Sequence, residues 1–123
     1  MLASLFLFKD APAPVAPTGA VIYEANLRAE GAQGGFSALT SRFSSLKKLG
    51  VDVVWLMPVQ PVGKLRSAGG LGSPYAISDY DHLNPEFGTE AEFKALIAEA
   101  HRLKMRVILD WVANHTAWDH PWV

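Results

Sequence analysis

Short apolar runs alternate along the chain with longer stretches whose apolar residues recur every three or four positions. The runs lie at residues 21–24, 51–57 and 105–109, and each has the length of one buried strand. The stretches between them have the spacing of amphipathic helices. The order strand, helix, strand, helix, strand predicts a parallel sheet whose strands are joined by right-handed crossovers.

The two expected helices have continuous apolar faces, and their ends carry recognisable signals. Gly50 stands where a C-terminal cap of the first helix belongs. Thr89 and Glu92 have the spacing of a capping box, in which the hydroxyl bonds the backbone ahead and the carboxylate reaches back. The expected apolar faces are Phe36, Leu39, Phe43, Leu46 and Leu49 in the first helix, and Phe93, Leu96, Ile97, Ala100 and Leu103 in the second.

The fold class predicted by this pattern is α/β, with three parallel strands and intervening helices. It fits a small open doubly wound sheet or the first part of a (β/α)8 barrel, and periodicity alone does not choose between them. We expect residues 20–123 to form this unit and residues 1–19 to form an N-terminal segment that ends in a Pro/Ala connector. The apolar run at residues 2–8 lacks the charged start and the cleavage site of a signal peptide. A strand, a packing segment or a ragged end is favoured there.

Composition excludes several classes of partner and of chemistry. The formal net charge of 123 residues is -1, so no basic field indicates a nucleic acid or an anionic membrane as partner. No apolar run approaches the ~20 residues that span a bilayer. The chain contains no cysteine, which excludes disulfides and thiolate catalysis without deciding the compartment.

Polar residues that could carry chemistry appear abruptly after the third strand. Asp110, Asn114 and His115 follow the apolar residues 107–109. A second group, which includes Tyr75 and Asp79, lies in the long loop at residues 58–87, and loops of this length are usually functional or disordered. Because ligands of parallel α/β folds bind at the carboxyl ends of the strands, we expect a site there.

Simpler interpretations of single residues stay open. Asp110 and Asp79 could be turn formers, and His115 alone could be a hydrogen-bonded structural histidine. His115 and His120 are weak evidence for a metal pair at their five-residue spacing. Three tryptophans could be core residues or sugar platforms, namely Trp111, Trp118 and Trp122. The glycines at residues 69–72 lack the strand-to-helix context and the Lys-Ser/Thr ending of a phosphate loop.

The combination of motifs resembles the α-amylase family of glycoside hydrolases from about residue 21 to the end. Residues 49–58 are similar to the segment that joins the first helix and second strand of that family's (β/α)8 barrel. The motifs are Gly72-Ser73-Pro74-Tyr75-Ala76-Ile77-Ser78-Asp79-Tyr80, Asn84-Pro85-Glu86-Phe87-Gly88-Thr89 and Asp110-Trp111-Val112-Ala113-Asn114-His115-Thr116. The resemblance thus implies the first three strands of a barrel.

The resemblance also implies a role for each candidate residue. Tyr75 matches the tyrosine that stacks on the sugar next to the cleaved bond, and His115 matches the histidine that hydrogen-bonds this sugar and favours its charged transition state. Asn114 matches a calcium ligand of many members, so calcium is an expected cofactor. Asp110 matches a brace near the active centre, and Asp79 matches a largely structural position. The implied substrate is an α-glucan or a maltooligosaccharide.

The same resemblance places the catalytic carboxylates on strands beyond Val123. A (β/α)8 barrel takes about 250 residues, and the family uses a retaining mechanism with a nucleophile and an acid/base. We therefore expect these 123 residues alone to hydrolyse no α-glucan and to need the remaining barrel strands for a complete domain. The rivals are a non-catalytic α/β carbohydrate-binding or interaction module, and a transglycosidase or isomerase of the same family. Members are often exported, but the N-terminus indicates no localisation.

Overall fold

The computed structural model describes residues 19–30 and 34–123, and it contains the parallel sheet predicted from the sequence. The predictions for the N-terminal segment before Gly19 lie outside these residues. In chain order the elements are β1 (Ile22–Ala25), η2 (Leu27–Ala29), α1 (Gly35–Lys48), β2 (Val53–Leu56), η3 (Pro85–Phe87), α2 (Glu90–Arg102) and β3 (Arg106–Leu109). The strand order is β1-β2-β3, and both pairings are parallel.

The second strand is shorter than the apolar run that predicts it. Val51 does not join the sheet, because its backbone N–H donates to the Leu46 carbonyl at the end of α1 (3.1 Å). Gly50 precedes it with a φ of 90°, a conformation that glycine adopts without steric cost. The turn after α1 therefore takes Val51, and β2 begins at Val53.

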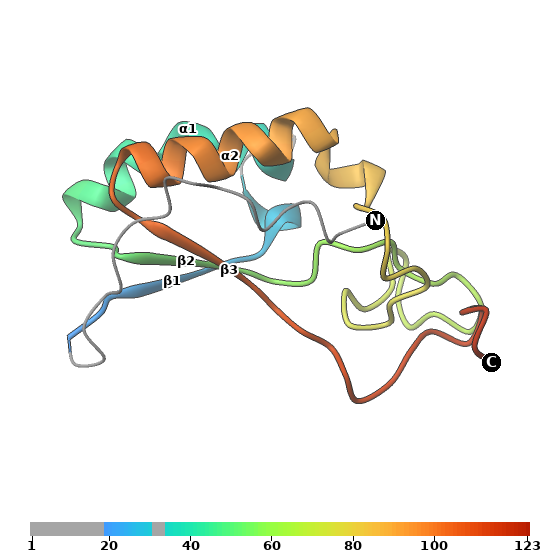
Figure 1. Ribbon diagram of the computed structural model, residues 1–123. Helices are drawn as coiled ribbons and strands as arrows, with labels where there is room; N and C mark the ends of the chain where they lie inside the picture. Colours follow the sequence, from blue (N-terminus) through green and yellow to red (C-terminus); the bar gives the residue numbers. More distant parts are fainter. Residues whose placement is uncertain (1–18, 31–33) are drawn as a thin grey trace.

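Both long helices cover the same face of the sheet, as Figure 1 shows. Val54 and Leu56 point into this layer and are fully buried, together with Phe36 and Phe93 from the two helices. The rings of Phe36 and Phe93 lie 5.1 Å apart, so they join α1 to α2 above the strands. Burial of this shared apolar layer is the main force that holds the helices against the sheet.

Two expectations about burial are wrong. The run 105–109 was expected to form a buried strand, but Ile108 is 44% exposed and Leu109 is 38% exposed. In the part of the chain that the structure describes, β3 is an edge strand and the sheet face opposite the helices has no covering layer. Leu49 was expected on the apolar face of α1, but it is 78% exposed because it is the C-cap residue, beyond the last helical turn.

The second helix begins as predicted. The Thr89 hydroxyl accepts a hydrogen bond from the backbone N–H of Glu92 (3.2 Å), and the Glu92 carboxylate accepts one from the backbone N–H of Thr89 (2.7 Å). Two N–H groups that have no partner within the helix are satisfied in this way. Neither α1 nor α2 is long and apolar enough to cross a bilayer, within the residues that the structure describes.

Candidate functional site

Two segments far apart in sequence meet at the carboxyl ends of the strands. One is the long connection from β2 to η3, and the other follows β3 to the end of the chain (Figure 1). Val62 pairs with Ile77 in an antiparallel bridge, and the backbone N–H of Ala117 donates to the Ile77 carbonyl (2.8 Å). The long loop is therefore an ordered structure with its own backbone pairing, and the C-terminal segment is attached to it.

Tyr75 and Asp110 are in direct contact. Asp110 follows β3, and its backbone N–H continues the sheet ladder by donating to the Leu56 carbonyl (2.9 Å). The Tyr75 hydroxyl donates to Oδ2 of Asp110 (3.1 Å) across 35 residues of sequence. Burial and this hydrogen bond to a carboxylate raise the pKa of the Tyr75 phenol above its usual range, so the phenol keeps its proton.

Asn114 and His115 are exposed neighbours in the segment after β3. The amide nitrogen of Asn114 lies 3.1 Å from Nδ1 of His115, which fits an amide donor facing the unprotonated ring nitrogen. His115 also borders a hollow of about 220 Å³ together with Ser73 and Ala76, which flank Tyr75 in sequence. The tertiary structure thus brings the imidazole to the same region as the Tyr75 turn.

Asp79 lies in a turn and contacts the residues of that turn. Its Oδ1 accepts from the backbone N–H of Asp81 (2.8 Å), and its Oδ2 lies 2.7 Å from Nδ1 of His82. The backbone N–H of Asp81 and the imidazole of His82 hold the pKa of the Asp79 carboxyl below its usual range. These contacts agree with the structural role that the resemblance implies.

The structure answers two questions that the sequence left open. His120 is buried against Tyr80 and Trp122, and its Nδ1 accepts the backbone N–H of Trp122 (3.1 Å). A ring packed in this way is no metal partner for His115. Trp111, Trp118 and Trp122 are 74%, 58% and 77% exposed, so none of the three is a core residue in the described part of the chain.

Tyr80 fixes the segment that carries Asn114 and His115, a role that sequence reasoning missed. Its hydroxyl lies 2.8 Å from the Val112 carbonyl and 3.1 Å from the His115 carbonyl, so it donates to both ends of a short loop. Its ring stacks on Trp122, with the ring planes 18° apart. A lone tyrosine in a loop gives no sequence signal for such contacts, because its partners lie more than 30 residues away.

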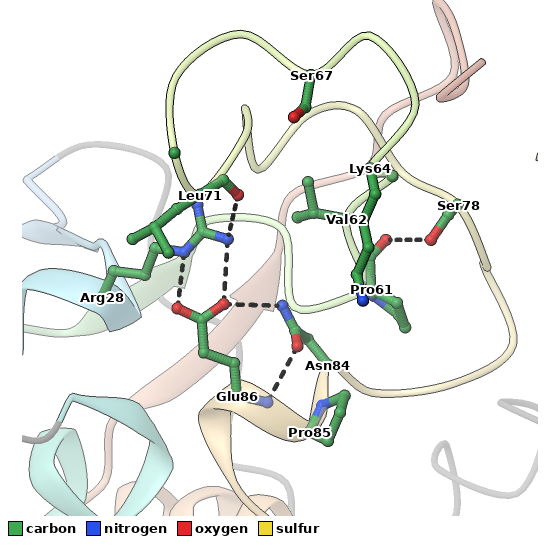
Figure 2. A pocket seen from close by; sticks show the side chains of 12 residues that line it. Arg28, Pro61, Val62, Lys64, Ser67, Leu71, Ser78, Asn84, Pro85 and Glu86 are labelled. Carbon is green, nitrogen blue, oxygen red and sulfur yellow. Dashed lines mark hydrogen bonds and ion pairs between the residues drawn. The ribbon is translucent and has the colours of Figure 1, made fainter. Parts of the chain in front are cut away.

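Arg28 attaches the long loop to η2 and η3, a second role that no sequence signal predicts. Figure 2 shows its guanidinium facing Glu86 and Leu71. Nε and Nη2 donate to the two carboxylate oxygens of Glu86 (3.0 and 3.1 Å), while Nη1 donates to the Gly72 carbonyl (2.9 Å) and Nη2 also donates to the Leu71 carbonyl (3.0 Å). One side chain therefore ties η2, η3 and the start of the Tyr75 turn together. Arg28, Leu71 and Glu86 line a second hollow of about 700 Å³, whose lining contains none of the predicted site residues.

The described residues offer few ligands for calcium. Calcium takes six to eight oxygen ligands, usually including carboxylates. Within residues 19–30 and 34–123, no group of three or more His, Cys, Asp or Glu side chains could hold a metal ion. Asn114 supplies one amide oxygen, and its amide nitrogen faces His115. The donor set present does not by itself make a calcium site, so calcium stays a prediction.

Comparisons with known proteins all point to the same family. The model of the alpha amylase catalytic domain matches residues 14–123. The chain is 36% identical over 89 residues to the alpha-amylase SusG of Bacteroides thetaiotaomicron, covering 72% of this chain and 12% of that protein. It is 40% identical over 108 residues to the trehalose synthase/amylase TreS of Mycobacterium tuberculosis, covering 84% of this chain and 17% of that protein.

A solved structure gives the same answer for the fold. The crystal structure of an alpha-amylase from Lactobacillus plantarum superposes with a TM-score of 0.81 at 46% identity, covering 83% of this chain and 24% of that one. The described strands and helices match the N-terminal part of a (β/α)8 barrel, which excludes the open doubly wound sheet. The chain thus spans a quarter or less of the length of these proteins.

Proposed function

The chain belongs to the α-amylase family of glycoside hydrolases, and from that premise we propose that it binds and helps to process α-glucosidic bonds of starch-like glucans. In this proposal, the chain supplies the wall of the sugar-binding site that is formed at the ends of the first three strands. The complete reaction is hydrolysis with retention at the anomeric carbon, which uses a carboxylate nucleophile and a carboxylic acid/base about 5 Å apart. Neither role is assigned to a carboxylate of this chain.

The hydrogen bond between Tyr75 and Asp110 is the observation that carries the proposal. It joins the turn at residues 73–76 to the end of β3, so the phenol hydroxyl is held at the carboxyl end of the sheet. A ring fixed in this way can present a flat apolar face to the apolar face of a sugar. His115, in the same region, can donate or accept a hydrogen bond to a sugar hydroxyl.

Each polar group then has a defined task. Asp110 orients the Tyr75 ring, because its carboxylate accepts a hydrogen bond from the phenol hydroxyl. His115 can bond a sugar hydroxyl through Nε2, because its Nδ1 faces the amide nitrogen of Asn114. Tyr80 and Arg28 position these groups from outside the site.

A transglycosidase or isomerase function of the same family is the second candidate. The observation that favours it is the 40% identity to the relative named trehalose synthase/amylase, over a longer segment than the match to the amylase relative. Both functions use the same sugar-binding wall. Product analysis separates them: a hydrolase releases reducing sugars from a maltooligosaccharide, and an isomerase converts maltose without a net gain of reducing ends.

The binding part of the proposal is tested on the 123-residue chain with maltotriose and its β-linked isomer cellotriose. We expect saturable binding of maltotriose by calorimetry, with shifts of the Tyr75 ring and His115 imidazole signals in NMR spectra, and no saturable binding of cellotriose. Tyr75→Ala should abolish binding, and Tyr23→Ala, on β1 and bonded to Glu30, should not. Equal binding of both trisaccharides, or of neither, would overturn the proposal.

Calcium at Asn114 is a separate proposal, implied by family membership. If the ion binds through this amide oxygen, calcium should raise the melting temperature of the chain and a chelator should reverse the rise. Asn114→Ala should remove the calcium effect, and Asn26→Ala, at the start of η2, should leave it unchanged. An equal melting temperature with calcium and with chelator would exclude the site in this chain.

A further inference from the structure

We propose that His120 is a positioning residue for the loop at residues 112–115, and that this loop keeps its place only while the His120 ring is neutral. The proposal deepens the proposed function and rests on it, because that loop carries His115. His120 itself touches no sugar in the proposal. Protonation of its ring would release the loop and weaken glucan binding.

His120 closes the turn formed by residues 117–123. Its backbone N–H donates to the Ala117 carbonyl (3.2 Å), and its carbonyl accepts the backbone N–H of Val123 (2.9 Å). Its side chain adds a third bond, because Nδ1 accepts the backbone N–H of Trp122 (3.1 Å). A ring nitrogen that accepts a hydrogen bond carries no proton, so this geometry needs a neutral imidazole with its proton on Nε2. The ring is buried, so water has little access to replace the acceptor if it is lost.

Three rings connect this turn to the long loop. The centre of the His120 ring lies 4.5 Å from that of Trp122 and 5.5 Å from that of Tyr80, and Tyr80 stacks on Trp122 at 5.5 Å. Because Trp122 is 77% exposed, little other packing holds its ring, and the bond to Nδ1 fixes its backbone. The position of the Tyr80 ring therefore depends on His120, both directly and through Trp122.

Tyr80 transmits this order to the site. Its hydroxyl donates to the Val112 carbonyl (2.8 Å) and to the His115 carbonyl (3.1 Å), at the two ends of the loop. A hydroxyl has a single proton to share between these carbonyls, so the arrangement tolerates little movement of the ring. The path from His120 to His115 thus consists of aromatic contacts and one hydroxyl group.

Protonation of His120 removes the acceptor that closes the turn. Imidazole is the side chain that gains a proton between about pH 5 and pH 8. A proton on Nδ1 would face the backbone N–H of Trp122, so that two donors meet and the hydrogen bond is lost. The aromatic faces of Tyr80 and Trp122 attract a charged ring, but this attraction does not replace the acceptor. The order of the turn is therefore present at higher pH and is lost as the pH falls.

No ion pair holds the His120 ring within the described residues. The titratable group in contact with it is the Tyr80 phenol, whose hydroxyl is bonded to the two carbonyls. Oδ2 of Asp119 bonds the backbone N–H groups of Lys64 and Leu65 and not the imidazole. The charged or titratable residues within two positions of Tyr80 or His120 are Asp79, Asp81, His82 and Asp119. The response to pH therefore depends on the acceptor at Nδ1 and not on a salt bridge.

Two substitutions separate the acceptor from the charge. In His120→Asn, the side-chain oxygen lies near the place of Nδ1 and can accept the Trp122 N–H, but the amide gains no proton in this pH range. In His120→Gln, the amide lies near the place of Nε2, so the acceptor at Nδ1 is lost. His82→Asn is the matched control, because it removes an exposed imidazole from the long loop.

The test measures maltotriose binding to the 123-residue chain by calorimetry, from about pH 8 to pH 5. The parent chain and His82→Asn should lose affinity about tenfold as the pH falls, consistent with loss of one hydrogen bond. His120→Asn should bind as the parent does at pH 8 and keep that affinity over the whole range. His120→Gln should bind weakly at every pH. In NMR spectra of the sugar-free parent chain, the His115 backbone signal should titrate with the midpoint of the His120 ring.

The outcomes separate this inference from the proposed function. A loss of affinity that persists in His120→Asn would come from another group, such as His115 itself, and would exclude the switch while the proposed function stands. A His115 backbone signal that does not follow the His120 midpoint would also exclude it, and this readout needs no variant. If maltotriose binds at no pH, the proposed function fails, and the sugar-free titration decides separately whether His120 positions the loop.

Discussion

Single polar side chains hold the site by bonding backbone groups far away in sequence. Tyr80, Arg28 and Asp119 all do this, and each attaches one loop to another. Loops lack the regular backbone ladder of a helix or sheet, so their carbonyl and N–H groups need such partners when they are withdrawn from water. The order of the site therefore depends on a few residues that touch no sugar in the proposed function.

Tyr80→Phe should loosen the segment that carries His115 while keeping the aromatic stack. The substitution removes the hydroxyl that bonds the Val112 and His115 carbonyls but leaves the ring against Trp122. We expect a loss of about 1 kcal/mol in the free energy of unfolding, measured with urea, and a shift of the His115 NMR signals. Tyr23→Phe, which loses a hydroxyl bonded to Glu30, should leave the His115 signals in place. Unmoved His115 signals in Tyr80→Phe would show that the hydroxyl does not position this loop.

Asp119 should make stability depend on pH in the acid range. Its pKa is lower in the folded chain than the ordinary value of about 3.9, because Lys64 and Leu65 donate to the carboxylate. Its contribution to stability is therefore complete above the unfolded-state pKa and is lost as the pH falls through the folded-state pKa. Asp119→Asn should be less stable than the parent chain at pH 7.

The measurement for Asp119 is urea unfolding at pH 7 and at pH 3. The difference between the parent chain and Asp119→Asn should narrow at pH 3, because below about 3.9 the unfolded chain binds a proton at Asp119 that the folded chain binds less readily. Asp81→Asn is the control, because the Asp81 carboxylate makes no hydrogen bond within the described residues. A difference that stays constant between the two pH values would rule out the carboxylate as its source.

Helix α2 shows how much a local signal can specify. The capping box at its start and its apolar face were both expected from residues three or four apart. Strand β3 shows the reverse. Its apolar sequence predicts burial, but burial depends on which layers cover the strand, and only one face is covered in the described chain.

Thr89→Ala should destabilise the chain by about 1 kcal/mol, because the backbone N–H of Glu92 loses its acceptor at the start of α2. Thr89→Ser should restore most of the loss, since serine supplies the same oxygen. Ser41→Ala is the matched control on α1, where the hydroxyl bonds the Ala38 carbonyl within the helix. Its effect should stay within about 0.5 kcal/mol. Urea unfolding followed by circular dichroism measures all three, and equal effects of Thr89→Ala and Ser41→Ala would argue against the cap.

The molecule as a whole has two unlike faces. Helices α1 and α2 cover one side of the sheet, and the opposite side exposes Ile22 (55%) and Ile108 (44%) (Figure 1). Large exposed apolar areas usually mark surfaces that bind other protein or aggregate. In the proposed function, this face belongs to the inside of a barrel that further strands complete.

The exposed face should bind a hydrophobic dye in the 123-residue chain. Ile108→Thr should lower dye fluorescence, because it removes an apolar side chain from the edge strand and keeps a residue that favours strands. Leu71→Thr is the control, since Leu71 is 68% exposed but lies in the long loop. Dye fluorescence at the level of a buffer blank, or an equal decrease in both variants, would show that the sheet face is not the binding surface.

The sequence by itself determined the strand order, the helix ends and the family motifs around Tyr75, Asp110 and His115. These signals are local: they reside in neighbouring residues or in residues one helical turn apart, and they can be seen without knowing the fold. The prediction of a parallel sheet followed from their order along the chain, because short apolar strands joined by helices have few other arrangements. The structure confirmed this part.

Only the tertiary structure decided which side chains meet and which faces are covered. Arg28 forms hydrogen bonds with residues 43 to 58 positions away, and Tyr75 forms one with Asp110, 35 positions away. No local sequence pattern predicts either contact. The exposure of Trp118 and Ile108 has the same origin, because burial is a property of the layers around a residue and not of the residue. Sequence periodicity sets which elements form, and long-range packing sets what they present to a ligand.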